Sequence, residues 1–369
     1  MIVSTLLLAS DIEKGIEAYK KGDYKSALYH YERASLDGNS RAKTNLALMY
    51  RYSIGVKKDL KKALKLLEEA AENGYPRALT LLGGMYEEGV GTRRDISKAL
   101  SLYEKAASKG YTDAMVRLAY LYENEAKTDR GLKKALKWYT TAAKKGNIEA
   151  QTNLGAMYDR GLGVKEDPSL AAFWWGKAAK RGSLEATNAL GYLYLLGRGV
   201  EKDPKRAFDL FLKAANMGSL QARHNVAYLY ENGLGIEKSC KKALTWYKRS
   251  AKEEYTPSMV SLAMIYLTGE CTKKEPQTAV DLLKRAAKRD DPAAPFLLGQ
   301  LYEEGKAVKQ DFKEAAFWYQ KGAERGDVQA QYNLGLLYYN GLGVQKDPVR
   351  ADFWMKKAKE GGLKIPGSL

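Results

Sequence analysis

The sequence predicts an all-α fold, a solenoid of stacked two-helix repeats. The chain resembles itself every 36 residues with no insertion, and self-similarity at a fixed period of ~20–50 residues is typical of repeat proteins. Within each repeat, two segments have helical spacing of apolar residues and are separated by glycines. One small residue recurs as Ala42, Ala78, Ala114, Ala150, Ala186, Ala222, Ser258, Ala294 and Ala330, and one tyrosine recurs in all nine repeats from Tyr50 to Tyr338.

The first helix of a repeat is clearest between residues 148 and 160. Gly161 and Gly163 interrupt the helical pattern directly after it. The apolar residues of this segment share one face of a 3.6-residue helix, at Ala150, Leu154, Met157 and Tyr158. This predicts the first helix of each repeat, which we call helix A.

The second helix of the repeat begins at an Asp-Pro pair. Asp167 can accept a hydrogen bond as N-cap, and Pro168 suits the first helical position. Gly182 is placed for a left-handed C-terminal residue. A hairpin of ~36 residues cannot bury its apolar face alone, so it stacks on its copies. The apolar face of this helix B is made by Ala171, Trp174, Trp175, Ala178 and Ala179.

Four segments divide the chain. Residues 1–10 (MIVSTLLLAS) form an apolar run, interpreted either as the remnant of a secretory signal peptide or as a buried N-terminal turn. Residues 11–39 match the second half of the repeat better than the first and are expected to be a degenerate capping helix pair. Nine full repeats follow over residues 40–362, and residues 363–369 are a short C-terminal tail that leaves self-association through this end open.

The repeat pattern also resembles a known family. The sequence A-x-x-x-L-G-x-x-Y-x-x-G-x-G-V-x-x-D, continued by A-x-x-W-Y-x-K-A-A-x-x-G, is seen at Ala330–Gly362 and Ala150–Gly182. It is similar to the Sel-one-like repeat (SLR), a relative of the tetratricopeptide repeat. The resemblance implies a right-handed α-solenoid that scaffolds protein complexes, common in bacteria and often extracytoplasmic. We therefore expect a periplasmic or secreted protein, with a cytoplasmic location as the alternative.

The charge balance favours anionic partners. Lys and Arg number 61 and Asp and Glu 44, a net charge of +17. A nucleic-acid groove would need exposed stacking aromatics among the basic residues. The aromatic columns here follow the packing faces, so we expect an acidic protein partner or a merely solvated face. A basic column at the turns between helices A and B includes Lys202, Lys238 and Lys274.

Nothing in the sequence predicts catalysis, a cofactor or a metal site. The chain has two histidines, His30 and His224, far apart in the array. Cys240 and Cys271 lie in neighbouring repeats without metal-ligand spacing. Both a disulfide and two reduced thiols are compatible with their positions near adjacent turns.

Most positions that carry the same residue type in several repeats are expected to have a structural role. One position on the packing face of helix B is tryptophan in several repeats and leucine in others. We therefore expect these tryptophans to be buried in the core. A row of asparagines is expected to hydrogen-bond between helices. The two rows consist of Trp138, Trp174, Trp246, Trp318 and Trp354, and of Asn45, Asn153, Asn225 and Asn333.

Function is expected where packing leaves helix A free. The positions of Thr44, Leu48 and Arg51 point away from that of Ala42 at ~100° per residue, and such a row lines the concave side of helical solenoids. In the middle repeats the row is rich in tyrosine, a residue common in interface hot spots. The candidate partner-binding residues are Tyr120, Asn188, Tyr192, Leu195, His224, Tyr228 and Glu231.

The sequence thus predicts a non-enzymatic scaffold that binds a protein through the concave helix A surface. Two narrower hypotheses remain open. One is an immunity protein that antagonises a secreted bacterial toxin, since exported SLR proteins include such antagonists. The other is a cell-envelope module that binds peptidoglycan.

Overall fold

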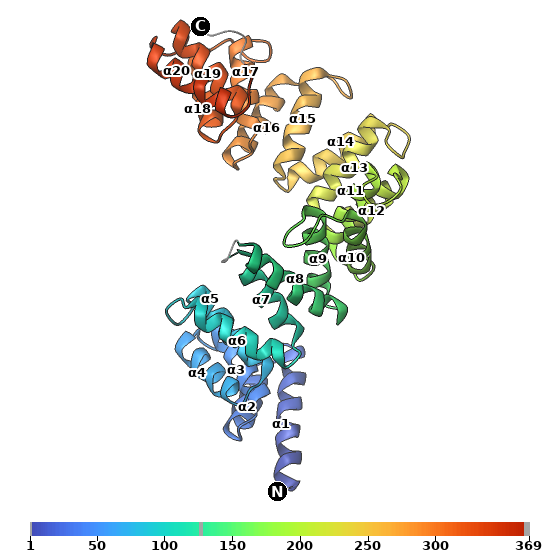
Figure 1. Cartoon of the computed structure of the whole chain (residues 1–369), viewed down its shortest axis with the longest axis vertical. Coiled ribbons are helices and arrows are strands. Elements are labelled where there is room, and N and C mark those ends of the chain that lie inside the picture. The colour runs from blue at the N-terminus through green and yellow to red at the C-terminus, as the bar shows by residue number, and fades with distance from the viewer. Residues whose placement is uncertain (1, 125–127, 365–369) are drawn as a thin grey trace. The chain divides into compact units, whose positions relative to one another are not determined.

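The computed structural model describes the backbone of residues 2–124 and 128–364 and the side chains from residue 11 onward in these ranges. Its described residues form helices joined by turns, with no strand among them (Figure 1). The helices are α1 (Ile2–Lys20), α2 (Tyr24–Leu36), α3 (Ser40–Tyr52), α4 (Leu60–Glu72), α5 (Pro76–Glu88), α6 (Ile96–Ser108), α7 (Thr112–Asn124), α8 (Asp129–Lys144), α9 (Ile148–Arg160), α10 (Pro168–Lys180), α11 (Leu184–Leu196), α12 (Pro204–Asn216), α13 (Leu220–Asn232), α14 (Cys240–Lys252), α15 (Thr256–Thr268), α16 (Pro276–Lys288), α17 (Ala294–Glu304), α18 (Phe312–Glu324), α19 (Val328–Asn340) and α20 (Pro348–Glu360).

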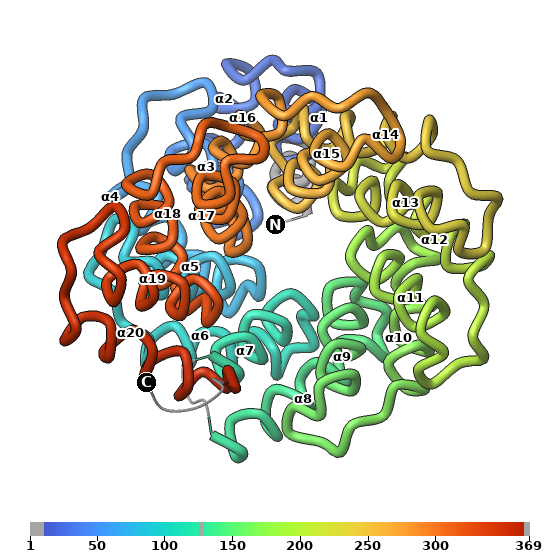
Figure 2. Tube along the Cα trace, turned by 90° about the horizontal axis from the view of Figure 1, so that it is seen from above, coloured from blue at the N-terminus to red at the C-terminus, as the bar shows by residue number. Residues whose placement is uncertain are grey.

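The helices fall into two compact units, unit 1 (Met1–Ala186) and unit 2 (Thr187–Leu369). Each predicted helix A is odd-numbered. In α1–α10 and α13–α20 each odd-numbered helix packs against the even-numbered helix B that follows it, and α11 contacts α12 through Tyr192 and Phe211. Within each unit, the odd-numbered helices follow the inner side of the stack (Figure 2). Successive odd-numbered helices also contact each other, as α3 does α5 and α17 does α19. The all-α solenoid of 36-residue hairpins is therefore confirmed.

Helix ends follow the predicted capping chemistry. The Asp167 carboxylate accepts a hydrogen bond from the Leu170 amide at 2.9 Å, directly ahead of Pro168. Gly161 ends α9 in the left-handed conformation, which glycine adopts without a Cβ clash. Aspartate caps several other even-numbered helices in the same way, at Asp59, Asp95, Asp203, Asp311 and Asp347.

The second glycine of the turn is needed for close packing between repeats. A Cβ on Gly163 would lie 2.6 Å from the carbonyl carbon of Leu132, the fourth residue of the preceding even-numbered helix, α8. Gly235 and Gly343 approach the backbone of Pro204 and Phe312 at the corresponding places. The turn of one repeat is thus pressed against the start of helix B in the repeat before it.

The core runs along the helix seams. The recurring small residue, Ala42 to Ala330, is fully buried in every repeat. Trp174 and Trp318 are buried and Trp138, Trp246 and Trp354 are half-buried, which confirms their place in the packing. The recurring tyrosines are buried or half-buried, and several hydroxyls find the local acceptor that burial demands. Tyr122, for example, donates to Glu104 at 2.7 Å.

The structure describes the two ends of the chain only in part. Residues 2–10 continue α1 in backbone trace, but the side chains of Met1–Ser10 lie outside the described residues, so the signal-peptide interpretation stays a prediction. Of the C-terminal tail, residues 365–369 are also outside the described part. Among described residues, no helix combines the length and apolar character needed to cross a bilayer.

Candidate functional site

The position of Thr44 on the odd-numbered helices is not free. Thr44 and Val116 are buried, and so is Asn188, which we expected on an open row. In unit 1, Thr152 lies 3.0 Å from the Ser183 hydroxyl. In unit 2, His224 Nδ1 lies 3.2 Å from the Ser258 hydroxyl in the next odd-numbered helix. This position therefore packs against the neighbouring repeat, a contact that the angles of one helix do not reveal.

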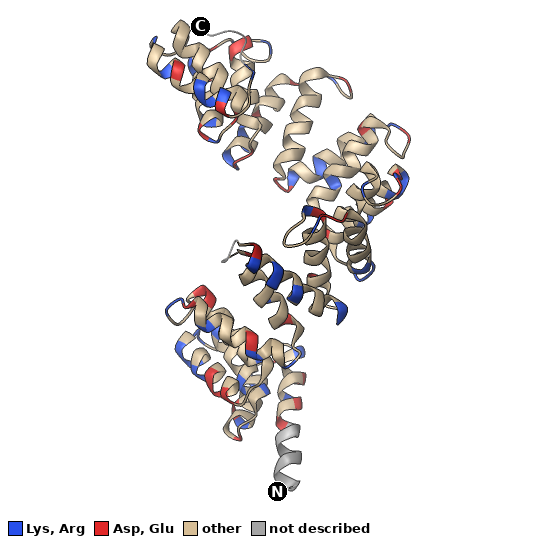
Figure 3. Cartoon of the chain, viewed as in Figure 1, with Lys and Arg blue, Asp and Glu red and all other residues tan. Residues whose placement is uncertain are grey.

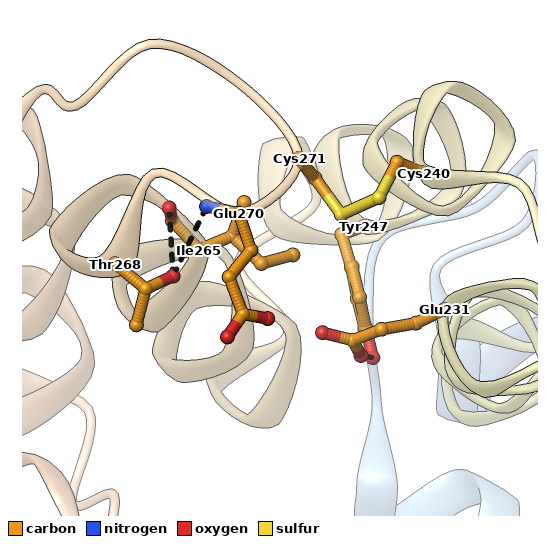
Figure 4. The surroundings of a disulfide bond; sticks show 7 residues. All are labelled: Glu231, Cys240, Tyr247, Ile265, Thr268, Glu270 and Cys271. Atoms are coloured by element: carbon orange, nitrogen blue, oxygen red, sulfur yellow. Dashed lines mark hydrogen bonds between the residues drawn. A yellow bond between two sulfur atoms is a disulfide. The ribbon is translucent and has the colours of Figure 1, made fainter.

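The position of Arg51 is largely occupied by pairing within the hairpin. Glu231 accepts a hydrogen bond from the Tyr247 hydroxyl at 2.8 Å, so its carboxylate is engaged (Figure 4). Burial, and then the adjacent Glu231, raise the pKa of Tyr247. Leu195 is half-buried against the core of unit 2. The same Tyr–Glu pair recurs as Tyr103–Glu87, Tyr139–Glu123 and Tyr319–Glu303.

The position of Leu48 reaches solvent in three repeats, and Tyr339 is exposed at the position of Arg51. Tyr120 on α7 is 49% exposed in unit 1, while Tyr228 on α13 is 45% exposed and Met264 on α15 39% exposed in unit 2. Tyr228 and Met264 hold corresponding positions of consecutive repeats. Of the predicted candidates, Tyr120 and Tyr228 are therefore the ones with a large accessible surface.

Tyr192 holds this same position on α11 but is drawn into the structure. Its hydroxyl donates to Asn225 Oδ1 at 2.7 Å, and the Asn225 amide donates to Asn188 Oδ1 at 2.9 Å. Its ring packs edge-on against Phe211, with centroids 5.1 Å apart. Burial raises the pKa of Tyr192. Tyr192, Asn188 and Asn225 thus form a structural network. This role was expected for Asn225, whereas Tyr192 and Asn188 were predicted to bind a partner.

His224, a further candidate residue on α13, is packed against side chains of the neighbouring helices. Its ring lies among the rings of Tyr247 and Tyr255, with centroids 5.3 and 5.9 Å away, and beside the Ser258 hydroxyl. Burial lowers the pKa of His224 to about 4, so the imidazole is neutral near pH 7. We therefore place His224 in the packing between α13, α14 and α15 rather than on the open surface.

The basic turn residues are accessible. Lys202, Lys238 and Lys274 are exposed and precede α12, α14 and α16, in line with the expected column. Basic and acidic residues are interspersed along the helices and turns of both units (Figure 3). Within the described part, no group of three or more His, Cys, Asp or Glu side chains is arranged to hold a metal ion.

The two cysteines form a disulfide (Figure 4). Cys240 begins α14 and Cys271 lies in the turn after α15, with Cα atoms 5.0 Å apart. They occupy the positions of Leu132 and Gly163 in the close approach between repeats described above. From the sequence, a disulfide and two reduced thiols were both compatible with these positions, because the close approach between adjacent repeats is a tertiary contact.

Comparison with known proteins accounts for the whole array. The sequence model of the Sel1 repeat matches ten successive segments: 6–39, 40–75, 76–111, 112–147, 148–183, 184–219, 220–255, 256–291, 292–327 and 328–363. The chain belongs to the Sel1 repeat family. The match includes 6–39, most of which we expected to be a degenerate cap. Members of this family commonly act as protein-interaction scaffolds and are typically not enzymes. A comparison with curated proteins finds no match.

Solved structures agree with this assignment. The chain is 31% identical to a protective antigen of uropathogenic Escherichia coli with an SLR fold, covering 97% of this chain and 79% of the antigen at a TM-score of 0.72. It is 32% identical to a Sel1 repeat protein from Oxalobacter formigenes, over 81% of this chain and 88% of that one at a TM-score of 0.67. An immunity protein of Pseudomonas aeruginosa is 19% identical over 61% of this chain and 89% of its own, at a TM-score of 0.40 that supports no functional argument.

Proposed function

We propose that this protein is a scaffold that binds a partner protein through the odd-numbered helices of unit 2, centred on Tyr228 and Met264. The observation that carries the proposal is their exposure at corresponding positions of consecutive repeats. Tyrosine gives a large contact area at low entropic cost, and methionine adapts to varied apolar surfaces. The flanking positions on α13 and α15 are used for packing, so these two side chains are available for recognition.

The surrounding packing supports a preformed surface. His224 and Ser258 join α13 to α15, and Tyr247 joins α14 to α13 through Glu231. A partner would therefore meet Tyr228 and Met264 on helices already held together, which reduces the entropy lost on binding. The exposed Lys238 and Lys274 in the adjacent turns would speed the approach of an acidic partner, mainly through the association rate.

The test is affinity capture from the native host, identification of the captured protein, and titration of that protein against variants. We expect Tyr228→Ala combined with Met264→Ala to weaken binding by roughly a thousandfold, if each contributes on the order of 2 kcal/mol. Phe317→Ala is the matched control, because Phe317 is 50% exposed in the same unit but lies on the even-numbered helix α18. Equal effects of the two variants would contradict the proposed surface.

The identity of the captured protein also separates narrower forms of this function. A secreted toxin whose activity is blocked by the complex would make the protein an immunity protein. Binding to purified peptidoglycan sacculi, lost in the Tyr228 and Met264 variant, would make it a cell-envelope module. An acidic partner whose association slows at high salt would support the role of the basic turns.

We further propose that the protein works outside the cytoplasm. The support is the Cys240–Cys271 disulfide, because such bonds persist mainly in oxidising compartments. Fractionation of the native host, with N-terminal sequencing of the purified protein, tests this. Recovery in the periplasm or medium with a start near Ser10 or Asp11 is expected, whereas an intact Met1 in the cytosolic fraction would contradict it.

A further inference from the structure

The first turns of α3 and α5 carry an unusual charge. Arg41 and Arg77 occupy the second position of these helices, where the next three repeats have Asp113, Glu149 and Glu185. The amino end of a helix carries a partial positive charge, so an acidic residue there is favourable and an arginine is not. In unit 1, two consecutive repeats thus place a cation where helix stability favours an anion.

Both arginines line one pocket in unit 1. The pocket has a volume of about 240 Å³ and is lined by residues of α1, α2, α3 and α5. Lys20 adds a third cation, and Tyr31 and Asn45 supply polar atoms. Pockets for drug-sized ligands measure roughly 300–1,000 Å³, so this one suits a smaller group, such as one residue of a peptide.

The positive charge of the pocket is only partly neutralised. Arg41 forms an ion pair of 3.2 Å with Glu13, and both side chains are largely exposed. Arg77 instead donates to the neutral Asn45 Oδ1 at 2.9 Å. Three cations and one paired carboxylate leave a net charge of +2 around the pocket. An anionic group entering here would meet the guanidinium groups of Arg41 and Arg77.

The donors are also held in place. Asn45 binds the Arg77 guanidinium through its carbonyl and interacts with the hydroxyl of the buried Tyr31. Burial raises the pKa of Tyr31. The apolar side chains of Ile16 and Leu48 complete the wall. The pocket therefore combines a fixed cation, a hydroxyl and an apolar surface.

We propose that this pocket binds a carboxylate carried by a small apolar residue of a partner peptide. Arg77 and Arg41 would pair with the carboxylate oxygens, and Ile16 and Leu48 would contact the apolar group. Arginine suits this role because its planar guanidinium matches a carboxylate with two parallel hydrogen bonds. The site lies in unit 1 and does not depend on the surface proposed for unit 2.

The test measures fluorescence anisotropy of three labelled pentapeptides with the full chain. The first is Gly-Gly-Ser-Ala-Leu with a free C-terminal carboxylate, and the second is the same peptide with a C-terminal amide. The third is an amidated peptide in which Glu replaces the last Leu. We expect a carboxylate peptide to bind at least about tenfold more tightly than the neutral amide. Preference for the first peptide supports a chain terminus on an apolar residue. Preference for the third peptide would contradict the proposed contact of an apolar group with Ile16 and Leu48.

Variants connect this binding to the pocket. Arg77→Gln should weaken binding about tenfold, while its amide can still donate to Asn45, and Arg41→Gln should act in the same direction. Lys58→Gln is the control, because it removes one positive charge from unit 1 in the exposed turn at the far end of α3 and should change binding less than about twofold. Thermal melts verify folding of each variant. Equal binding of all three peptides, no binding up to about 1 mM, or equal loss in Arg77→Gln and Lys58→Gln would overturn the proposal.

Discussion

Tyr192 and Tyr228 are corresponding residues of neighbouring repeats, yet one is part of the packing and the other faces solvent. Tyr192 on α11 packs on Phe211 and donates to Asn225. Tyr228 on α13 is 45% exposed. The backbone position is the same in both repeats. The difference therefore comes from what the surrounding helices place beside each ring.

Side chains around this position are exchanged between the two repeats, including the aromatic residue on the even-numbered helix. Phe211 on α12 has no hydroxyl, so it cannot bond to Asn225, and Asn225 accepts from Tyr192 instead. In the next repeat the corresponding residue is Tyr247, whose own hydroxyl bonds to Glu231. Tyr228 is then left without such a partner in the packing. The partners are exchanged as well, because Ser261 takes the place of Asn225 and Leu195 takes the place of Glu231. Several side chains around the position thus differ between the two repeats.

The largest effect is expected from removing the ring that holds Tyr192. Phe211→Ala should destabilise unit 2 by ~3–5 kcal/mol, because a fully buried Phe leaves a cavity. Urea unfolding measures this loss. Phe317→Ala removes an exposed ring from the same unit and should cost less than ~0.5 kcal/mol. Similar losses in the two variants would show that the packing around Tyr192 is not as described.

A pH titration examines the repeat that contains Tyr228, where His224 packs beside Tyr247. The pKa of His224 is about 4 in the folded chain and 6.5 in the unfolded chain. Above pH 6.5 both states are neutral, and stability is unaffected. Between pH 6.5 and about 4 the unfolded chain binds a proton that the folded chain does not, so stability falls by up to ~3 kcal/mol.

His224→Gln is the variant that isolates this effect. The difference in unfolding free energy between the variant and the wild type should change across this pH range and stay constant above it. A constant difference from pH 7 to 4 would mean that His224 is open to solvent in the folded chain.

Truncation of the two tyrosines compares their roles directly. Tyr192→Ala should cost ~2–3 kcal/mol, because it removes a half-buried ring and the hydrogen bond to Asn225. Tyr228→Ala should cost less than ~1 kcal/mol. Thermal melts of both variants provide the measurement. This corrects the sequence-based view of the two residues as an equivalent outward pair.

The smallest expected effect concerns the hydroxyls alone. Tyr192→Phe leaves the Asn225 carbonyl without its donor and should cost ~1 kcal/mol, whereas Tyr228→Phe should be neutral. Unfolding midpoints at several temperatures resolve a difference of this size. A neutral Tyr192→Phe would indicate that Asn225 finds another donor and that the ring contact with Phe211 holds Tyr192.

Sequence alone was sufficient for the fold because its signals are local and recur nine times. The alanines of the seam, the Asp-Pro starts such as Asp167-Pro168, and the turn glycines each restrict nearby backbone, and their 36-residue register defines which hairpins stack. The structural role of the tryptophans and of Asn225 followed from the same columns. The pairing of Cys240 with Cys271 did not follow, because they replace a backbone contact between repeats that only the tertiary structure reveals.

Only the tertiary structure decided which helix A residues are free. Angles around one helix placed Asn188, His224 and Glu231 outward, but a helix in a stack has neighbours on several sides. Asn188 meets Asn225, His224 meets Ser258, and Glu231 meets Tyr247, each through a contact with another helix. The pocket of Arg41 and Arg77 likewise needs α1, α3 and α5 together. Burial and charge at these positions are properties of several helices at once, so the period of one repeat cannot specify them.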